Sequence, residues 1–267
     1  MRLLSCFVVI LILITSCTPN NVHEDGSLEE ILAQHNLEGC FGLFDNGQGK
    51  FTIYNVPRYR DSAFSPASTF KIVNSLIGIK TGKVFDETMV IRWDGITRPF
   101  TAWNRDLNMV EAFKLSAVSY YQEVARRIGK DTMQLWLDSL HYGNGQISII
   151  DSFWLDNSLK IRPDEQLGLV KRLYFGQLPM DKRPQRIVKD MMLQESNANY
   201  MLSYKTGLGT KENGRPLGWV IGWIEENRHP YFFVLNVEGN PGQDITEARM
   251  KALKTILKKL GFFEGKK

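Results

Sequence analysis

The stretch PASTFKIVNSLIGI, Pro66–Ile79, places a serine and a lysine three residues apart at the start of an apolar helical run. Ser68 and Lys71 are the only such Ser and Lys in the chain at this spacing. On a helix, positions i and i+3 lie on one face, so the Lys71 amine can reach the Ser68 hydroxyl. The unpaired N–H groups of a helix N-terminus also favour an oxyanion beside the serine. The stretch predicts a serine nucleophile with its own base; the alternative is a helix cap followed by a surface lysine.

The first seventeen residues have the pattern of a secretion signal. Arg2 precedes an apolar run from Leu3 to Ile14, which is short for a membrane span. The residues before Cys17 fit the pattern recognised in bacterial lipoprotein processing. We therefore expect a lipoprotein-type signal peptide over 1–17, lipidation of Cys17, and a periplasmic protein anchored to the membrane through that lipid. Ordinary signal cleavage nearby is the alternative.

Composition argues against several classes of function. Cys40 has no obvious partner once the signal is processed, so no structural disulfide is expected. The net charge of +4 is modest, and its densest basic stretch, Lys251 to Lys259, has the spacing of a solvated helix face, so no nucleic-acid partner is expected. The four histidines lack metal-ligand spacing and no glycine-rich phosphate loop is present, so neither a metal nor a nucleotide cofactor is expected. The sequence does not specify an oligomeric state.

The order of predicted elements indicates strands at both ends of the chain with helices between them. Residues 18–26 are polar and predict a tether, and Ser27 with Glu30 predicts a helix cap. Asp131 with Gln134 predicts another helix start. We expect a hairpin of strands at 40–44 and 51–54, helices at 68–79, 110–115, 119–128, 132–140, 163–174 and 184–193, strands at 200–205, 217–225 and 231–237, and a last helix at 246–260.

This order predicts an α/β protein of the α+β type. Its antiparallel β-sheet is formed from both chain ends, has flanking helices, and contains an inserted helical subdomain of about 68–195. The chain is long enough for one compact unit, so we expect a single catalytic domain over 27–265. A cleft is expected where the sheet and the helical insertion meet.

Three further short motifs lie downstream of Ser68. Lys205, Thr206 and Gly207 end a predicted strand, where the glycine would let a substrate approach the backbone. The same triplet at 80–82 closes the helix that begins near Ser68, and there its glycine is a C-terminal cap. Ser116, with Val118, lies at a helix junction, and a Tyr-Gly-Asn turn follows at 142–144; taken singly, such residues usually cap helices and make turns.

The order and separation of these motifs resemble those of the class D β-lactamases, the oxacillinases. The resemblance covers most of the chain after the signal and includes 153–155 and Arg249. Class A β-lactamases and penicillin-binding peptidases share only part of it, because they place an amide where this chain has Val118. The resemblance implies a serine β-lactamase/penicillin-binding-protein-like fold and a β-lactamase that hydrolyses the amide of penicillin-type antibiotics through an acyl-enzyme.

The apolar residue of the Ser116–Val118 motif bears on the protonation state of Lys71. A lysine with an ordinary pKa of about 10.4 is protonated at neutral pH and cannot accept a proton. Burial beside Phe70, Val118, Trp154 and Leu155 would lower the pKa of Lys71 and leave a neutral amine. The resemblance implies that this amine takes up carbon dioxide and becomes the general base (N6-carboxylysine), with no cofactor other than carbon dioxide or bicarbonate. It also implies that the Trp154 indole N–H holds the carbamate; the alternative for Trp154 is an ordinary place in the core.

The remaining roles are implied by matching positions. Ser116 would relay a proton to the leaving β-lactam nitrogen, assisted by the charge of Lys205. Backbone N–H groups of Ser68 and Leu208 would form the oxyanion hole. Arg249 would bind the substrate carboxylate through a planar two-pronged contact, although a surface role is the default for a residue in a basic helix. The implied catalytic residues are Ser68, Lys71, Ser116, Trp154 and Lys205, and the implied substrate-binding residues are Val118, Thr206, Gly207, Leu208 and Arg249.

Other functions remain open. A cell-wall peptidase acylates in the same way but deacylates slowly on β-lactams, and the apolar surroundings of Lys71 favour the lactamase over it. The antibiotic-sensing domain of a membrane receptor also stays acylated, but it would need spanning helices and an effector domain that this sequence does not show. A solitary lipoprotein binding module is a third alternative. Under the leading hypothesis the partner is a small-molecule β-lactam.

Overall fold

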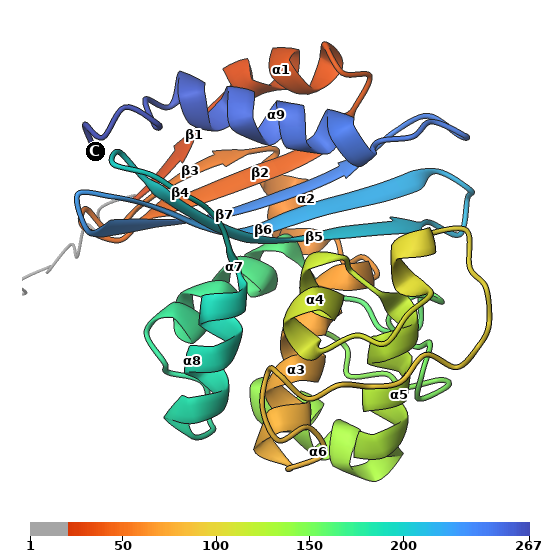
Figure 1. Ribbon diagram of the computed structural model, residues 1–267. Helices are drawn as coiled ribbons and strands as arrows, with labels where there is room; N and C mark the ends of the chain where they lie inside the picture. Colours follow the sequence, from red (N-terminus) through yellow and green to blue (C-terminus); the bar gives the residue numbers. More distant parts are fainter. Residues whose placement is uncertain (1–20) are drawn as a thin grey trace, which may run out of the picture.

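The computed structural model describes residues 21–267, so the predicted signal peptide and Cys17 lie outside the described residues. A seven-stranded sheet in the order β1-β3-β2-β7-β6-β5-β4 runs through the molecule (Figure 1). Neighbouring strands are antiparallel except for β1 and β3, which are parallel. The strands are β1 (Val22–Glu24), β2 (Glu38–Asp45), β3 (Lys50–Tyr54), β4 (Leu193–Ser196), β5 (Met201–Thr210), β6 (Pro216–Glu226) and β7 (His229–Glu238).

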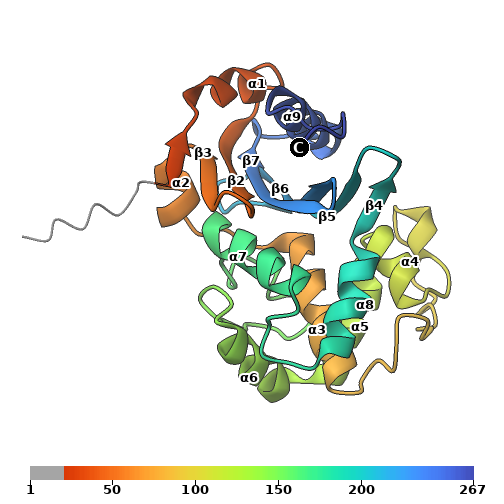
Figure 2. The same ribbon diagram turned by 90° about the vertical axis from the view of Figure 1, so that its left-hand side faces the viewer.

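Helices cover both faces of this sheet (Figures 1 and 2). On one face lie α1 (Glu29–Ala33), preceded by the 3-10 turn η1 (Gly26–Leu28), and α9 (Thr246–Lys259). On the other face lie α3 (Lys71–Lys80), preceded by the 3-10 turn η2 (Ala67–Phe70), and then α4 (Met109–Lys114), α5 (Val118–Ile128), α6 (Lys130–Leu140), α7 (Pro163–Tyr174) and α8 (Lys182–Met191). The short helix α2 (Val56–Asp61) packs against β2 and α7, and the 3-10 turn η3 (Thr101–Trp103) lies in the loop before α4. Within 21–267, no helix has the length and apolarity needed to cross a membrane.

The sheet is buried on both faces, and the side-chain alternation of β6 shows how. Trp219, Ile221 and Trp223 point into the core shared with the α3–α8 layer. Val220 and Ile224, at the alternate positions, point into the core shared with α1 and α9. Because successive side chains of a strand point to opposite faces, a continuous apolar run is what a strand covered on both sides requires. The predicted fold class, a sheet from both chain ends with an inserted helical layer, is confirmed.

Two predictions at the N-terminal side are wrong. Residues 18–26 were expected to form a tether, but Val22–Glu24 forms β1 and pairs with β3 from Val22↔Phe51 to Glu24↔Ile53. The predicted cap of the first helix by Ser27 is also wrong, because the side chain of Asp25 accepts the hydrogen bond from the Ser27 backbone N–H. The first segment is held by backbone pairing and the second by a side-chain cap two residues earlier than expected, and composition reveals neither.

Two helix starts also differ from the prediction. The helix expected from 132 begins at Lys130 after Gly129, and Asp131 does not cap it. The helix expected from Ser68 begins as η2, a 3-10 turn, and becomes α-helical only at Lys71. At the other end of α3 the prediction holds: Gly82 has φ +69° and its N–H donates to the carbonyl of Ile79. The division into a sheet subdomain and an inserted subdomain within 27–265 stays a prediction.

Candidate active site

Ser68 and Lys71 meet within η2 and the first residue of α3. A 3-10 turn has three residues per turn, so side chains at i and i+3 eclipse one another. Lys71 Nζ donates to Ser68 Oγ at 2.7 Å. The residue before the serine, Ala67, has φ +47°, a left-handed conformation that an alanine adopts only when the surroundings enforce it. The turn therefore presents the half-buried Ser68 hydroxyl directly to the lysine amine.

Lys71 is fully buried, with 0% of its surface exposed. Its Nζ lies 5.5 Å from the centroid of the Tyr121 ring, and no carboxylate forms an ion pair with it within 21–267. Next to it in the chain, the Phe70 ring stacks on the Trp154 indole with centroids 5.4 Å apart. Burial, followed by the charge of Lys205, lowers the pKa of Lys71 well below its usual value. The physical consequence is a neutral amine beside the serine.

A second serine and lysine meet across the fold. Lys205 on β5 donates to Ser116 Oγ at 3.1 Å, although the two residues are 89 positions apart in the chain. Ser116 lies between α4 and α5 and has φ +54°, so its backbone is held in a conformation that is uncommon for serine. Burial, and then the charge of Arg249, lowers the pKa of Lys205 to about 7. This lysine changes its charge near neutral pH.

Gly207 brings β5 against the turn that carries Ser68. A Cβ atom added at this position would lie 3.0 Å from the Pro66 carbonyl oxygen and 3.2 Å from Thr69 Cγ2. That this glycine lets a substrate approach the backbone stays a prediction; the space that a side chain would need at this position is filled by η2. Only a residue without a side chain allows this packing. Gly207 therefore joins the Lys205–Thr206–Gly207 strand to the Ser68–Lys71 turn.

Trp154 is held in place by its backbone and leaves its indole nitrogen free. Ser65 Oγ donates to the Trp154 carbonyl at 2.8 Å, and the carbonyl of Ser65 accepts from the indole of Trp219 on β6 at 2.8 Å. The buried Nε1 of Trp154 itself has no hydrogen-bond partner within the described chain. A buried N–H donor without a partner is costly, and an acceptor bound at this site would satisfy it.

Arg249 is another buried group with free donors. It projects from α9, is 6% exposed, and its Nε and Nη1 atoms have no hydrogen-bond partner in residues 21–267. Burial lowers its pKa to about 10, so it remains charged at neutral pH. The surface role that is the default for a basic helix is thus wrong for Arg249. Gly218 on β6 lies against it, with the Arg249 Cδ atom 3.3 Å from where a Cβ would be.

The other predicted substrate contacts lie on the same strand and helix. Thr206 is half-buried and Leu208 exposed on β5, and Val118 is half-buried at the first position of α5. The turn at 142–144 is structural: Asn144 pairs with the backbone of Lys160 in both directions, at 2.9 and 3.0 Å. Gly143 has φ +53°, and a Cβ there would clash with the Lys160 carbonyl.

No sequence motif marks the residues that pack behind Lys71 and η2 and hold them in place. Tyr121 packs near Lys71, and its OH and carbonyl are hydrogen-bonded to Ser75 and Asn74 of α3. Gln166 on α7 donates to Thr69 Oγ1 at 2.8 Å and so ties η2 to the helical layer. The position of Tyr121, three residues after Val118 and hence on the same helix face, was the one signal available for it. Within 21–267, no group of three or more His, Cys, Asp or Glu side chains comes together as metal ligands.

Comparison with known proteins agrees with this geometry. Residues 39–260 match the family of penicillin-binding protein transpeptidase domains. The chain is 40% identical over 236 residues to β-lactamase OXA-48 of Klebsiella pneumoniae, with 88% of each chain covered. It superposes on FUS-1 (OXA-85), a class D β-lactamase of Fusobacterium nucleatum subsp. polymorphum, with a TM-score of 0.84 and 34% identity, over 90% of this chain and 100% of that one.

A receptor domain has the same fold. The C-terminal domain of the penicillin receptor BlaR of Bacillus licheniformis superposes with a TM-score of 0.86 and 30% identity, over 92% of this chain and 98% of that one. The fold and the two Ser–Lys pairs define a serine hydrolase of the transpeptidase group. Within that group the chain belongs to the class D β-lactamases, and it is a β-lactamase enzyme.

Proposed function

We propose that this β-lactamase hydrolyses the amide of penicillin-type antibiotics through an acyl-enzyme on Ser68, with Lys71, carboxylated on Nζ, as the general base. The observation that carries the proposal is the 2.7 Å contact between Ser68 Oγ and a fully buried lysine that has no carboxylate partner within the described chain. A neutral amine in such a pocket can add carbon dioxide, forming an N–C bond and releasing one proton to solvent.

In acylation, Lys71 in its carbamate form takes the proton of the Ser68 hydroxyl while Oγ bonds to the β-lactam carbonyl carbon. The C–N bond of the lactam then breaks, and the nitrogen receives a proton from the Ser116 hydroxyl. Lys205, which donates to Ser116 Oγ, replaces that proton. The backbone N–H groups of Ser68 and Leu208 stabilise the oxyanion, a contribution of about 3 kcal/mol for one such donor.

Between the half-reactions the protonated base gives up the proton that it took from Ser68, and Lys205 regains one, by exchange with solvent. In deacylation the base then takes a proton from water, and the resulting hydroxide attacks the ester carbonyl. The ester C–O bond breaks and the proton returns to Ser68 Oγ, which restores the enzyme. The unpartnered Nε1 of Trp154 supports this assignment, because a carbamate oxygen is the kind of acceptor that this buried N–H lacks. Trp154 thereby orients the base for both half-reactions.

The substrate carboxylate is placed on Arg249. Its Nε and Nη1 atoms have no partner within the described residues, and each shares with Nη2 an edge of the guanidinium that is suited to a planar, two-pronged contact with a carboxylate. Thr206, beside Lys205 on β5, adds a hydroxyl donor to the same group, and Val118 and Gly207 line the approach to Ser68. A bound anion would also favour the charged form of Lys205, whose pKa is otherwise held at about 7.

The alternative functions are a β-lactam sensor and a penicillin-binding peptidase, in which the acyl group stays on the serine. The likeness of the chain to a penicillin-receptor domain is the observation that favours the sensor. The two functions differ only in the rate of deacylation, so they differ in the lifetime of one covalent adduct.

The deciding experiment follows the Ser68 adduct and turnover together. Purified enzyme is mixed with a chromogenic cephalosporin with and without bicarbonate, and intact-protein mass spectrometry follows the adduct. The proposal expects many turnovers per enzyme, faster with bicarbonate and slower in acidic buffer depleted of carbon dioxide. A stoichiometric adduct that persists for hours identifies a sensor or peptidase, and turnover that ignores bicarbonate removes the carbamate from the mechanism. Carbon-13 dioxide gives an independent readout, a carbamate NMR signal that Lys71→Met should lack.

We also propose that the enzyme is exported to the periplasm and anchored through a lipid on Cys17, with its catalytic domain spanning 27–265. The apolar run and the residues before Cys17 support this. Fractionation of cells that express the chain and its Cys17→Ser variant tests it. The proposal expects wild-type activity in the membrane fraction and the variant's activity in the soluble periplasm; equal distribution of the two would show that Cys17 carries no anchor.

A further inference from the structure

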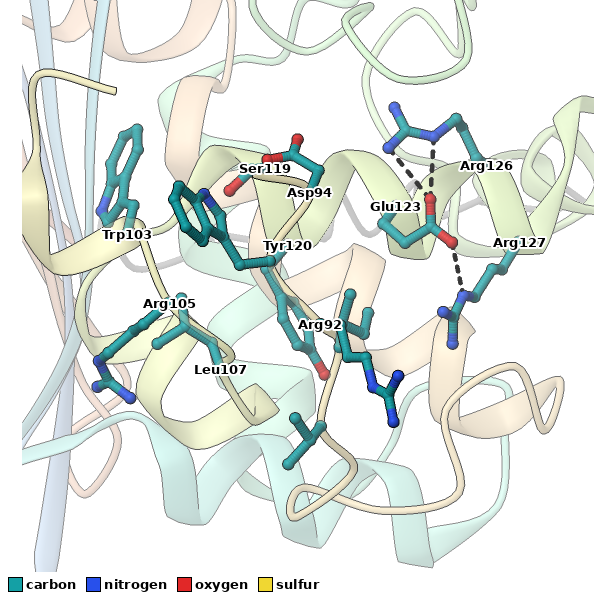
Figure 3. A pocket seen from close by; sticks show the side chains of 13 residues that line it. Arg92, Asp94, Trp103, Arg105, Leu107, Ser119, Tyr120, Glu123, Arg126 and Arg127 are labelled. Carbon is teal, nitrogen blue, oxygen red and sulfur yellow. Dashed lines mark hydrogen bonds and ion pairs between the residues drawn. The ribbon is translucent and has the colours of Figure 1, made fainter. Parts of the chain in front are cut away.

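A second cavity lies outside the catalytic centre, between the loop 90–107 and the outer face of α5 (Figure 3). Its volume is about 380 Å³, within the range of sites that hold small organic ligands. None of Ser68, Lys71, Lys205 and Arg249 lines it. Its lining is therefore distinct from these four residues of the catalytic centre.

The walls of this cavity combine arginines with aromatic rings. Arg126 and Arg127 of α5 meet on the carboxylate of Glu123, as Figure 3 shows, and Arg126 is also paired with Asp151 at 2.6 Å. Arg92 is different: it lines the cavity, is exposed, and forms no hydrogen bond or ion pair with any residue of 21–267. The cavity thus has one cation that is free to bind an anion from solution.

The apolar part of the lining includes one exposed indole, that of Trp93, beside the half-buried Trp103 and the buried Tyr120. Trp93 and Trp103 come from the loop and Tyr120 from α5. The Trp93 side chain is 38% exposed although its Nε1 is already hydrogen-bonded to the carbonyl of Ile96 at 3.0 Å. An indole that is fixed in position but left uncovered offers a flat apolar surface at little further cost in side-chain entropy.

We propose that this cavity binds a small organic anion that has an aromatic ring and a carboxylate. The ring would lie against Trp93 and Trp103, and the carboxylate would accept hydrogen bonds from Arg92. The cavity also touches the catalytic machinery at one point, because Trp103 Nε1 donates to the carbonyl of Leu115, the residue before Ser116, at 3.1 Å. A ligand here would therefore contact the support of the α4–α5 junction without occupying the substrate site.

The test uses 2-naphthoate as the probe and titrates it into the purified enzyme by isothermal calorimetry. Naphthalene-methanol, which has the ring but no charge, is the comparison ligand. The proposal expects naphthoate to bind about tenfold more tightly than the alcohol and about tenfold more tightly than it binds to Arg92→Gln. Arg60→Gln, which removes the same charge from the exposed end of α2, is the matched control and should bind naphthoate as the wild type does.

Further variants separate this cavity from the catalytic centre. Trp93→Ala should weaken binding of both ligands, whereas Arg249→Ala should leave naphthoate binding unchanged. Arg92→Gln should hydrolyse β-lactams at the wild-type rate, which also shows that it is folded. Undiminished naphthoate binding by Arg92→Gln, loss of binding in Arg249→Ala, or no binding at millimolar probe would each overturn the proposal.

Discussion

The molecule contains two Ser–Lys pairs that look alike as chemistry but are built in opposite ways. Ser68 and Lys71 are three residues apart and meet at 2.7 Å inside one turn. Ser116 and Lys205 are 89 residues apart and meet at 3.1 Å only because β5 packs beside the α4–α5 junction. Lys71 is completely buried and its pKa lies well below the usual value, whereas the pKa of Lys205 falls to about 7.

The comparison teaches that the surroundings, more than the residue type, assign these two lysines their roles, since both are buried but their pKa values are lowered to different extents. The lysine whose pKa is lowered further, Lys71, suits a base or a carbon dioxide acceptor. A lysine that titrates near neutrality can both hold and release a proton, which suits the relay to the leaving nitrogen.

The largest effect is expected from Lys71→Met, which keeps an apolar chain of similar length but removes the base. Because the base acts in both half-reactions, turnover should fall by at least about 10⁴-fold. Steady-state hydrolysis of a chromogenic cephalosporin measures this loss. Bicarbonate should not restore activity, and Lys71→Arg should be equally inactive, since a guanidinium neither releases its proton nor adds carbon dioxide. Activity in either variant would place the base elsewhere.

The same substitution should make the protein more stable. Burial lowers the pKa of Lys71 in the native protein, so below the ordinary lysine pKa the unfolded chain binds more protons than the native protein, and folding carries a free-energy cost. That cost shrinks as the pH rises towards the ordinary lysine pKa. Thermal melts in carbon-dioxide-free buffer should therefore show a higher Tm for Lys71→Met, with a larger gain at pH 6 than at pH 9. A gain that is equal at both pH values would contradict a neutral native lysine.

Activity should be less sensitive to substitution in the Ser116–Lys205 pair than to loss of Lys71. Ser116→Ala removes the hydroxyl between Lys205 and the leaving nitrogen, and acylation should slow by about 10²- to 10³-fold. Deacylation, which does not use this relay, should keep its rate. Rapid-quench measurement of the adduct on Ser68 separates the two steps. Equal slowing of both steps would mean that Ser116 supports the whole site and does not relay a proton.

A smaller effect is expected from Trp154→Phe, which keeps the ring stacked on Phe70 but removes the free indole N–H. If that N–H holds the carbamate, activity should fall about tenfold at ambient carbon dioxide. High bicarbonate should restore most of the lost activity, because a higher concentration of carbon dioxide raises the fraction of Lys71 that carries the carbamate. Trp219→Phe is the matched control: its indole N–H is hydrogen-bonded to Ser65, so a loss there should not respond to bicarbonate.

The local pair could be predicted from the sequence, and the distant pair only through a resemblance. Spacing alone placed Ser68 beside Lys71, and apolar periodicity found most helices of the insertion and the strands of both chain ends. Spacing could not reveal that the turn is a 3-10 turn after a left-handed Ala67, or that Ser116 also has positive φ. Such backbone conformations are imposed by packing, for example by the close approach of Gly207 to Pro66.

Elements held only by backbone pairing could likewise not be predicted from the sequence. The strand β1 is only three residues long and exposed at each of them, so it has no apolar pattern, and it exists because β3 offers an edge beside it. The part of the site behind Lys71 depends on contacts between α3 and α5, such as Asn74 to the carbonyl of Tyr121 at 3.0 Å. Contacts between distant segments leave no local signal in sequence.

The smallest effect is expected in the pH dependence of activity, which depends on the pH at which Lys205 loses its charge. Lys205 is charged below its pKa of about 7 and neutral above it, so kcat/KM, which reports the free enzyme, should decline above pH 7. A bound substrate carboxylate favours the charged form and raises that pKa, so the corresponding decline in kcat should begin at a higher pH. Lys205→Arg stays charged throughout this range and should lose the alkaline decline, but its rate should be lower than that of the wild type at every pH, because a guanidinium does not release the proton that the relay passes to Ser116. Coincident declines in kcat and kcat/KM, or a decline that survives in Lys205→Arg, would assign the titration to another group and remove the contrast between the two lysines.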